Sequence, residues 1–204
     1  MSTPHAGPQH APAPLPAAPG AADHPALALV NTRTARPTGP VDDLADPAAA
    51  REWLTTAGLL PSPAALTPAG IERLRSLREC VRALLGARLH HETPDPAALA
   101  EVNAVLGATP FGGRLHWEDA DAGPRLESLP AAATPLDAAL ALLARDAAEL
   151  LDGPQAASVA ACGAPDCIRF YLRTHAARQW CSQRCGDRVR AARHYARTRA
   201  AEQA

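Results

Sequence analysis

The chain has 204 residues, of which 47% are hydrophobic, and a formal net charge of −1. This length accommodates one medium-sized domain and a small additional module, and no apolar run reaches the roughly eighteen residues that a membrane-spanning helix needs. The charge is unevenly distributed: residues 162–204 hold nine arginines against three acidic residues, whereas residues 1–161 hold eleven against eighteen. The two parts are therefore expected to have different partners, unless the basic tail packs against its own acidic body.

The first 23 residues contain six prolines and no large apolar run. Such a composition cannot form a packed core, so residues 1–23 are predicted to be disordered. The segment also lacks the basic start and the continuous apolar stretch of a secretory signal. The protein is therefore expected to be cytoplasmic, where cysteine thiols stay reduced.

Residues 24–154 are predicted to form a helical body. Four apolar stripes are each preceded by a capping residue and a proline, which is typical of a helix start, because the cap accepts a backbone N–H and proline has none to satisfy. Each pair precedes apolar residues at three- and four-residue spacing, which indicate a helix with one buried face. The four pairs are Asp46-Pro47, Thr67-Pro68, Asp95-Pro96 and Thr134-Pro135.

Two other segments of the body are short. Residues 26–33 form an apolar run that fits either a helical turn or a strand. Residues 114–118 and 125–129 alternate between apolar and polar residues, and the residues between them are turn formers, which predicts a β-hairpin. The expected fold class is mainly α (α+β), with a helical body that carries one β-hairpin.

Four of the five cysteines lie close together near the C-terminus. Four, thirteen and three residues separate them in turn, which provides the two short pairs that a tetrahedral zinc site needs. Two disulfides, which require an oxidising compartment, or four unrelated core thiols are the alternatives. His175 and His194 could replace a cysteine, although four thiolates already complete the tetrahedron. The sequence predicts one structural zinc ion bound by Cys162, Cys167, Cys181 and Cys185.

Residues 155–204 are predicted to form a treble-clef-like zinc finger. Residues 168–174 are rich in strand formers, and residues 178–180 are expected to return as a second strand, so that a hairpin connects the cysteine pairs. Ser182 is a candidate N-cap, and the Ala- and Arg-rich chain after it predicts an exposed helix whose first turn carries Cys185. Because the apolar stripes all precede Cys162, the body is expected to fold without the finger.

The finger resembles the CGNR zinc finger of bacterial proteins described as stress-induced transcription regulators. The matching residues are Trp180-Cys181-Ser182 and Cys185-Gly186-Asp187-Arg188, where Asp187 replaces the Asn of the motif. An acid in the first helical turn is favoured by the helix dipole, but it cannot donate the hydrogen bond that an amide can. Residues 24–154 resemble the ABATE domain that precedes this finger, through Leu29-Val30-Asn31-Thr32-Arg33, Trp53-Leu54 and Leu99-Ala100-Glu101-Val102-Asn103 in that order.

The resemblance implies, and the charge distribution favours, a zinc-dependent, DNA-binding transcription regulator. Arginines of the finger are expected to contact phosphates, with DNA favoured over RNA. RNA binding and docking on another protein are alternatives, because treble-clef scaffolds serve many functions. Two roles are open for the body, homodimerisation and ligand sensing. The arginines predicted to contact nucleic acid are Arg178, Arg188, Arg190, Arg193, Arg197 and Arg199.

Catalysis is not expected. The sequence has no P-loop, dinucleotide-binding glycine motif, HExxH motif or nucleophile elbow. A zinc ion bound by four thiolates has no open position for a substrate. The fifth cysteine, Cys80, lies beside an apolar helical stripe and is predicted to be buried and inert.

Overall fold

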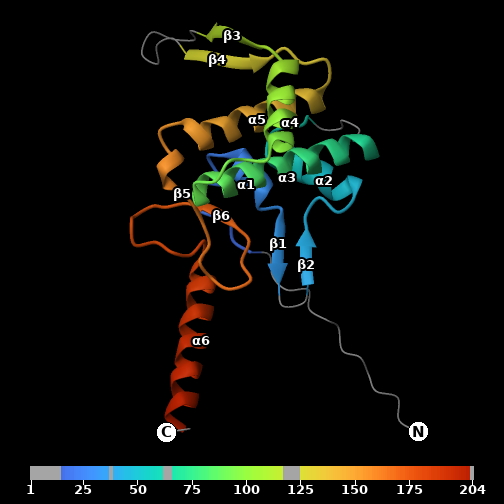
Figure 1. The fold of residues 1–204 in the computed structure, drawn as a ribbon. Helices are drawn as coiled ribbons and strands as arrows, with labels where there is room; N and C mark the ends of the chain where they lie inside the picture. The colour runs from blue at the N-terminus through green and yellow to red at the C-terminus, as the bar shows by residue number, and fades with distance from the viewer. Residues whose placement is uncertain (1–14, 37–38, 62–65, 117–124, 203–204) are drawn as a thin grey trace, which may run out of the picture.

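A computed structural model describes residues 15–36, 39–61, 66–116 and 125–202. In these segments five helices form a body, a sixth belongs to the C-terminal finger, and three antiparallel strand pairs flank or connect them (Figure 1). The mainly α (α+β) class and the four-cysteine finger are confirmed.

The body is built around α3 (Pro68–His90), which contacts α1 (Pro25–Val30), α2 (Pro47–Thr56), α4 (Pro96–Ala108) and α5 (Pro135–Asp152). Apolar stripes of these helices meet in one core, as their spacing predicts. The fully buried side chains at its centre include Leu27, Leu74, Leu77, Leu140 and Leu143.

The four predicted helix starts are all present, each with proline in the first turn. Asp46, Thr67, Asp95 and Thr134 each accept a backbone N–H of the first turn at 2.9–3.1 Å. A cap of this kind stabilises a helix by roughly 1 kcal/mol. The starts of these helices therefore follow from local sequence.

The described part of the body contains two β-hairpins, of which the sequence predicts one. The predicted hairpin is confirmed as β3 (Phe111–His116) paired with β4 (Arg125–Pro130). The other joins β1 (Arg33–Arg36) to β2 (Gly39–Asp42), so the apolar segment 26–33 holds most of helix α1 and the start of a strand. Arg78 of α3, which is 3% exposed, holds this hairpin by donating to both carboxylate oxygens of Asp42 at 2.6 and 2.9 Å.

The C-terminal part begins with the 3-10 turn η1 (Ala156–Ser158) and strand β5 (Val159–Ala161). Strand β6 (Phe170–Leu172) and helix α6 (Gln183–Glu202) follow. The hairpin predicted between the two cysteine pairs is wrong in its second strand. Strand β6 pairs with β5 and not with residues 178–180.

Residues 178–180 make other contacts, which explain why they do not pair as a strand. The Tyr171 hydroxyl donates to the carbonyl of Arg178 at 2.8 Å, and the N–H of Gly163 donates to the carbonyl of Gln179 at 2.9 Å. These two carbonyls are satisfied without strand pairing. The segment before the first cysteine is thus left to pair with β6.

The β5–β6 pair lies between two cores. Phe170 and Leu172 pack in the core of the body, whereas Tyr171 between them belongs to a second cluster that contains three of the cysteines. The Asn31 side chain of the body donates to the Phe170 carbonyl at 2.8 Å and accepts the Phe170 N–H at 3.0 Å. Losing the finger would remove these residues from the body's core, and independent folding of the body stays a prediction.

Residues 15–23, here called the N-terminal strap, lie against the finger. The carbonyl of Pro19 accepts the N–H of Leu172 at 2.8 Å, and that of Pro16 accepts Nη2 of Arg169 at 2.8 Å. Ala18 is 3% exposed within the cysteine cluster. The prediction of disorder is therefore wrong for residues 15–23, because carbonyl groups hold this proline-rich segment; residues 1–14 lie outside the described part.

Helix α6 leaves the finger and extends away from the body (Figure 1). From Arg190 to Ala201 every residue of the helix is exposed. Among the described helices, none is both long and apolar enough to cross a membrane.

Candidate metal centre

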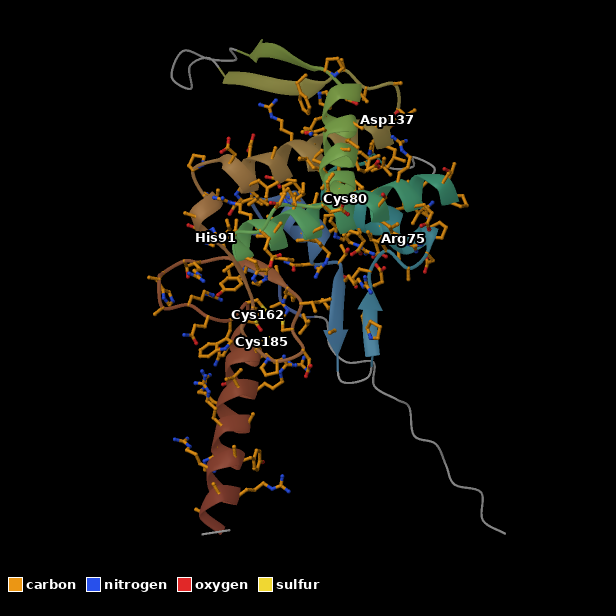
Figure 2. All side chains as sticks on the ribbon, viewed as in Figure 1. Arg75, Cys80, His91, Asp137, Cys162 and Cys185 are labelled. Atoms are coloured by element: carbon orange, nitrogen blue, oxygen red, sulfur yellow. The ribbon has the colours of Figure 1, made fainter. Side chains whose placement is uncertain are left out.

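The four predicted cysteine ligands come together between the β5–β6 pair and the start of α6, where Figure 2 labels Cys162 and Cys185. All four Sγ atoms lie within 4.8 Å of one another. The Sγ atom of Cys181 is 3.8 Å from that of Cys167 and 3.7 Å from that of Cys185. Zinc–sulfur bonds of about 2.3 Å in a tetrahedron place sulfur atoms about 3.8 Å apart, whereas a disulfide requires about 2 Å. The cysteines are free and fit a tetrahedral thiolate site.

The thiols of this cluster share protons. Hydrogen bonds from Cys167 and Cys181 hold the pKa of Cys162 far below its ordinary value. The hydrogen bond to Cys162 raises the pKa of Cys167 well above its ordinary range and that of Cys181 to about 11. One thiolate therefore forms easily, but four ionise together only when a cation offsets their repulsion. The donor set has the chemistry of a divalent-metal site.

Backbone geometry presents the first cysteine pair. Asp166 has a φ of 60°, a left-handed conformation that Asp tolerates better than most residues. The turn brings the N–H of Cys167 to the carbonyl of Ala164 at 3.1 Å. Arg188 of α6 donates to the carbonyl of Pro165 in the same turn at 2.7 Å. The first pair is thus tied to the helix that carries the last cysteine.

The start of α6 presents the second pair. Ser182 caps the helix as predicted, since its Oγ accepts the N–H of Cys185 at 3.3 Å. A Cβ at Gly186 would lie 3.1 Å from the ring of Trp180, so the ring packs directly on this glycine. Asp187, in the position of the motif's Asn, accepts from Arg190 at 2.5 Å.

The predicted nucleic-acid contacts include three arginines with partners inside the finger. Arg178 donates to the carbonyl of Trp180 at 3.1 Å, and Arg188 donates to the first cysteine turn. Arg190 pairs with Asp187 and lies 5.8 Å from the Trp180 ring centroid. These contacts stabilise the finger, and nucleic-acid contacts of the same side chains stay predictions.

The other three arginines, Arg193, Arg197 and Arg199, lie on the exposed part of α6. They have no side-chain partner among the residues that the structure describes. Arg193 and Arg197 line one surface pocket together with Arg190 and Ala196, so the predicted alignment of three arginines is present. Arg199 lies on the other side of the helix by its spacing.

Arg169 is the site residue that the sequence analysis misses. It is 4% exposed, and its Nη1 lies 3.8 Å from the Sγ of Cys181. A cation at this place favours the ionised thiol. Its position two residues after Cys167 is the sequence signal that places it near the metal centre. The signal is weak, because the other arginines of the finger look alike in sequence and most of them are exposed.

The histidines considered as ligands lie outside the cluster. His175 and His194 are exposed. In the described segments, the group of side chains that could bind a metal ion consists of the four cysteines alone. Cys80 is half-buried against the core of the body, and burial raises the pKa of its thiol.

Comparison with known families gives two matches in succession along the chain. Residues 23–154 match the ABATE model, described as "Putative stress-induced transcription regulator". Residues 159–198 match the model of the CGNR zinc finger. No curated protein matches the chain.

Proposed function

Because this chain belongs to the ABATE family, whose model matches residues 23–154, and carries a CGNR zinc finger, we propose that it is a DNA-binding transcription regulator that requires one structural zinc ion. The basic helix α6 is the proposed DNA-contacting element. The body and the strap hold the finger that presents this helix.

The donor set supports a structural role for the metal. Four thiolates at tetrahedral spacing would complete the coordination of Zn²⁺ and leave no position for a substrate. The bound ion would supply the charge that keeps all four sulfurs ionised, and the cysteines would hold the two chain turns together. On the same basis we infer a non-enzymatic protein that acts in the cytoplasm, where thiols stay reduced.

The exposed arginines of α6 carry the proposal. Twelve consecutive residues, Arg190 to Ala201, are exposed, and the arginines at 193, 197 and 199 have no side-chain partner in the described part of the chain. This distribution favours a phosphate partner over the alternative, a basic tail neutralised by its own acidic body. A helix segment of this length gains little stability from its own hydrogen bonds in water, so a bound partner would stabilise it.

The test is a binding titration with the full chain, because strand β6 of the finger packs in the core of the body. Fluorescence anisotropy of a labelled DNA duplex at several salt concentrations gives the slope of log affinity against log salt. Each neutralised phosphate adds about 0.9 to the magnitude of that slope. The double substitution Arg193→Gln with Arg197→Gln is expected to weaken binding and to reduce the slope by about 1.8.

A matched control removes the same charge from the body. Arg51 and Arg88 are exposed on α2 and α3, and Arg51→Gln with Arg88→Gln is expected to leave the slope unchanged. Zinc content is measured for every variant, so that a lost finger is not mistaken for a lost contact. A zinc-loaded wild-type chain without salt-dependent DNA binding would contradict the proposal. Tighter binding to duplex RNA would keep the phosphate-binding helix and overturn DNA as its target.

Dimerisation through the body stays a prediction. Size-exclusion chromatography with light scattering on the zinc-loaded chain would test it directly.

A further inference from the structure

Two adjoining pockets lie on the basic side of the finger. One, of about 310 Å³, lies at the start of α6 beside Trp180 and is here called the Trp180 pocket. The other, of about 610 Å³, lies along the exposed part of α6. The two pockets adjoin because Arg190 lines both of them.

The linings of both pockets are positively charged. They contain four arginines and no acidic residue of the described segments, the arginines being Arg178, Arg190, Arg193 and Arg197. Asp187 pairs with Arg190 from outside the linings. The other three arginines have no acidic partner among the residues that the structure describes. The charge therefore favours an anionic ligand that follows both pockets.

The Trp180 pocket also offers contacts that a phosphate does not need. Trp180 is half-buried, so part of this aromatic residue of the lining is accessible. His175 and Gln183 of the same lining are exposed, and their side chains have no partner in the described part of the chain. A nucleobase stacks on aromatic or guanidinium planes and forms hydrogen bonds along its edge. The pocket therefore combines the groups that recognise a single base.

The size of the Trp180 pocket favours an unpaired base. Its volume of about 310 Å³ is at the lower end of the range of roughly 300–1,000 Å³ for small-molecule pockets. One planar base fits such a volume, whereas stacked base pairs of a duplex do not. A paired base would have to leave its partner and its stack to enter, which costs free energy. A base that is already unpaired avoids this cost.

We propose that the Trp180 pocket binds one unpaired base of a DNA strand whose phosphates follow Arg190, Arg193 and Arg197 along α6. This rests on the proposed function, because it extends the phosphate contacts of the same helix. It narrows the target from any duplex to DNA with an unpaired nucleotide, such as an overhang or a bulge. Arg178 and Arg190 would hold the phosphates next to that base.

The test compares two labelled DNA duplexes that carry the same short overhang, one with thymines and one with abasic residues at the same positions. Both have the same phosphates, so a difference in affinity measures the contribution of the bases. Fluorescence anisotropy with the zinc-loaded full chain is expected to show at least about fivefold tighter binding of the thymine overhang, because a stacked base stabilises the complex. The slope of log affinity against log salt should be the same for both duplexes.

Two neighbouring alanines provide a matched pair of variants. Ala177→Leu places a larger side chain in the lining of the Trp180 pocket and leaves every cysteine and arginine unchanged. It is expected to reduce the preference for thymine over abasic residues to less than about twofold, without changing the salt slope. Ala176→Leu, at an exposed position outside the lining, is the control and should keep the preference.

The outcomes separate this proposal from the proposed function. Equal affinity of the wild-type chain for both overhangs, with a normal salt slope, would overturn the base pocket and leave DNA binding intact. Absence of salt-dependent binding to either duplex would overturn both. If Ala177→Leu and Ala176→Leu prefer thymine equally, the base lies elsewhere. Zinc content is measured throughout, and if Ala177→Leu loses its zinc, the comparison of the two overhangs on the wild-type chain decides.

Discussion

The body and the finger have cores of different kinds. In the described segments, 25 buried apolar residues form the core of the body, three of which come from strands β5 and β6. The finger's cluster contains eight buried residues, three of which are cysteines. Burying one leucine-sized side chain contributes about 1.5–3 kcal/mol, so the larger core can offset its own conformational entropy. The smaller one cannot, and it depends on the bonds between sulfur and metal.

The two cores nevertheless meet in one strand of three residues. Phe170 and Leu172 face the body, and Tyr171 faces the finger. This alternation follows from the period of two along a strand. A boundary drawn in sequence between two domains can therefore assign to one domain a strand that packs in the cores of both.

Removing a metal ligand should produce the largest difference between the stability of the finger and that of the body. Cys181→Ser is expected to abolish zinc binding and to unfold the finger, because metal binding supplies on the order of 10–16 kcal/mol in small zinc modules. Hydrogen exchange should become fast from Gly163 to Cys167 and from Arg173 to Val189, while α3, α5 and β6 stay protected. Zinc analysis with mass spectrometry measures both effects.

Cys80→Ser is the matched control, since it removes a thiol outside the cluster. One zinc ion per chain should remain bound in that variant. Unchanged exchange in zinc-free Cys181→Ser would contradict a metal-dependent finger.

Substitutions at two adjacent residues of β6 test the core of the body and the cluster of the finger separately. Phe170→Ala should lower the free energy of unfolding of the body by about 3–5 kcal/mol, with or without zinc, because Asn31 holds Phe170 on the body. Tyr171→Ala should destabilise the zinc-loaded finger and have little effect on the chelated protein. Urea denaturation of both variants, with and without chelator, measures this. If Phe170→Ala has no effect after chelation, β6 leaves the body together with the finger.

The hydrogen bonds of Asn31 provide a smaller test. Asn31→Ala leaves the buried N–H and carbonyl of Phe170 without these partners, and it should lower the free energy of unfolding by about 1–3 kcal/mol. Asn103→Ala, at an exposed position of α4, is the control and should change stability little. Equal effects of the two substitutions would argue against Asn31 as the connection between body and finger.

The smallest expected effect depends on pH. Burial alone would lower the pKa of His24, but hydrogen bonds to Asp146 and Gln155 raise it overall above the ordinary value of 6.5. Protonated His24 therefore stabilises the fold fully below about pH 6.5. The contribution is lost as pH rises through the raised pKa of the folded state. The stability difference between wild type and His24→Gln should shrink from about pH 6 to pH 8 in urea denaturation, and a constant difference would contradict the interpretation.

Local patterns predict much of this fold, and long-range contacts account for the rest. Each capping residue with its proline starts a helix, and the cysteine spacing identifies the metal centre, because these signals act within a few residues. The position of the β1–β2 hairpin depends on a contact with Arg78 of helix α3. The pairing of β6 depends on β5, a strand that precedes the first cysteine. The sequence predicts disorder for the strap because the residues that hold it lie about 150 positions away along the chain.

The exposed part of α6 also sets a distance. Twelve helical residues span about 18 Å, which is roughly twice the Debye length of about 8 Å at physiological ionic strength. A molecule bound near the end of α6 would therefore be largely screened from the acidic body, and the helix would work as a spacer as well as the proposed contact surface. The overall charge of −1 then says little about the field that such a molecule meets, because the arginines of the helix determine it locally.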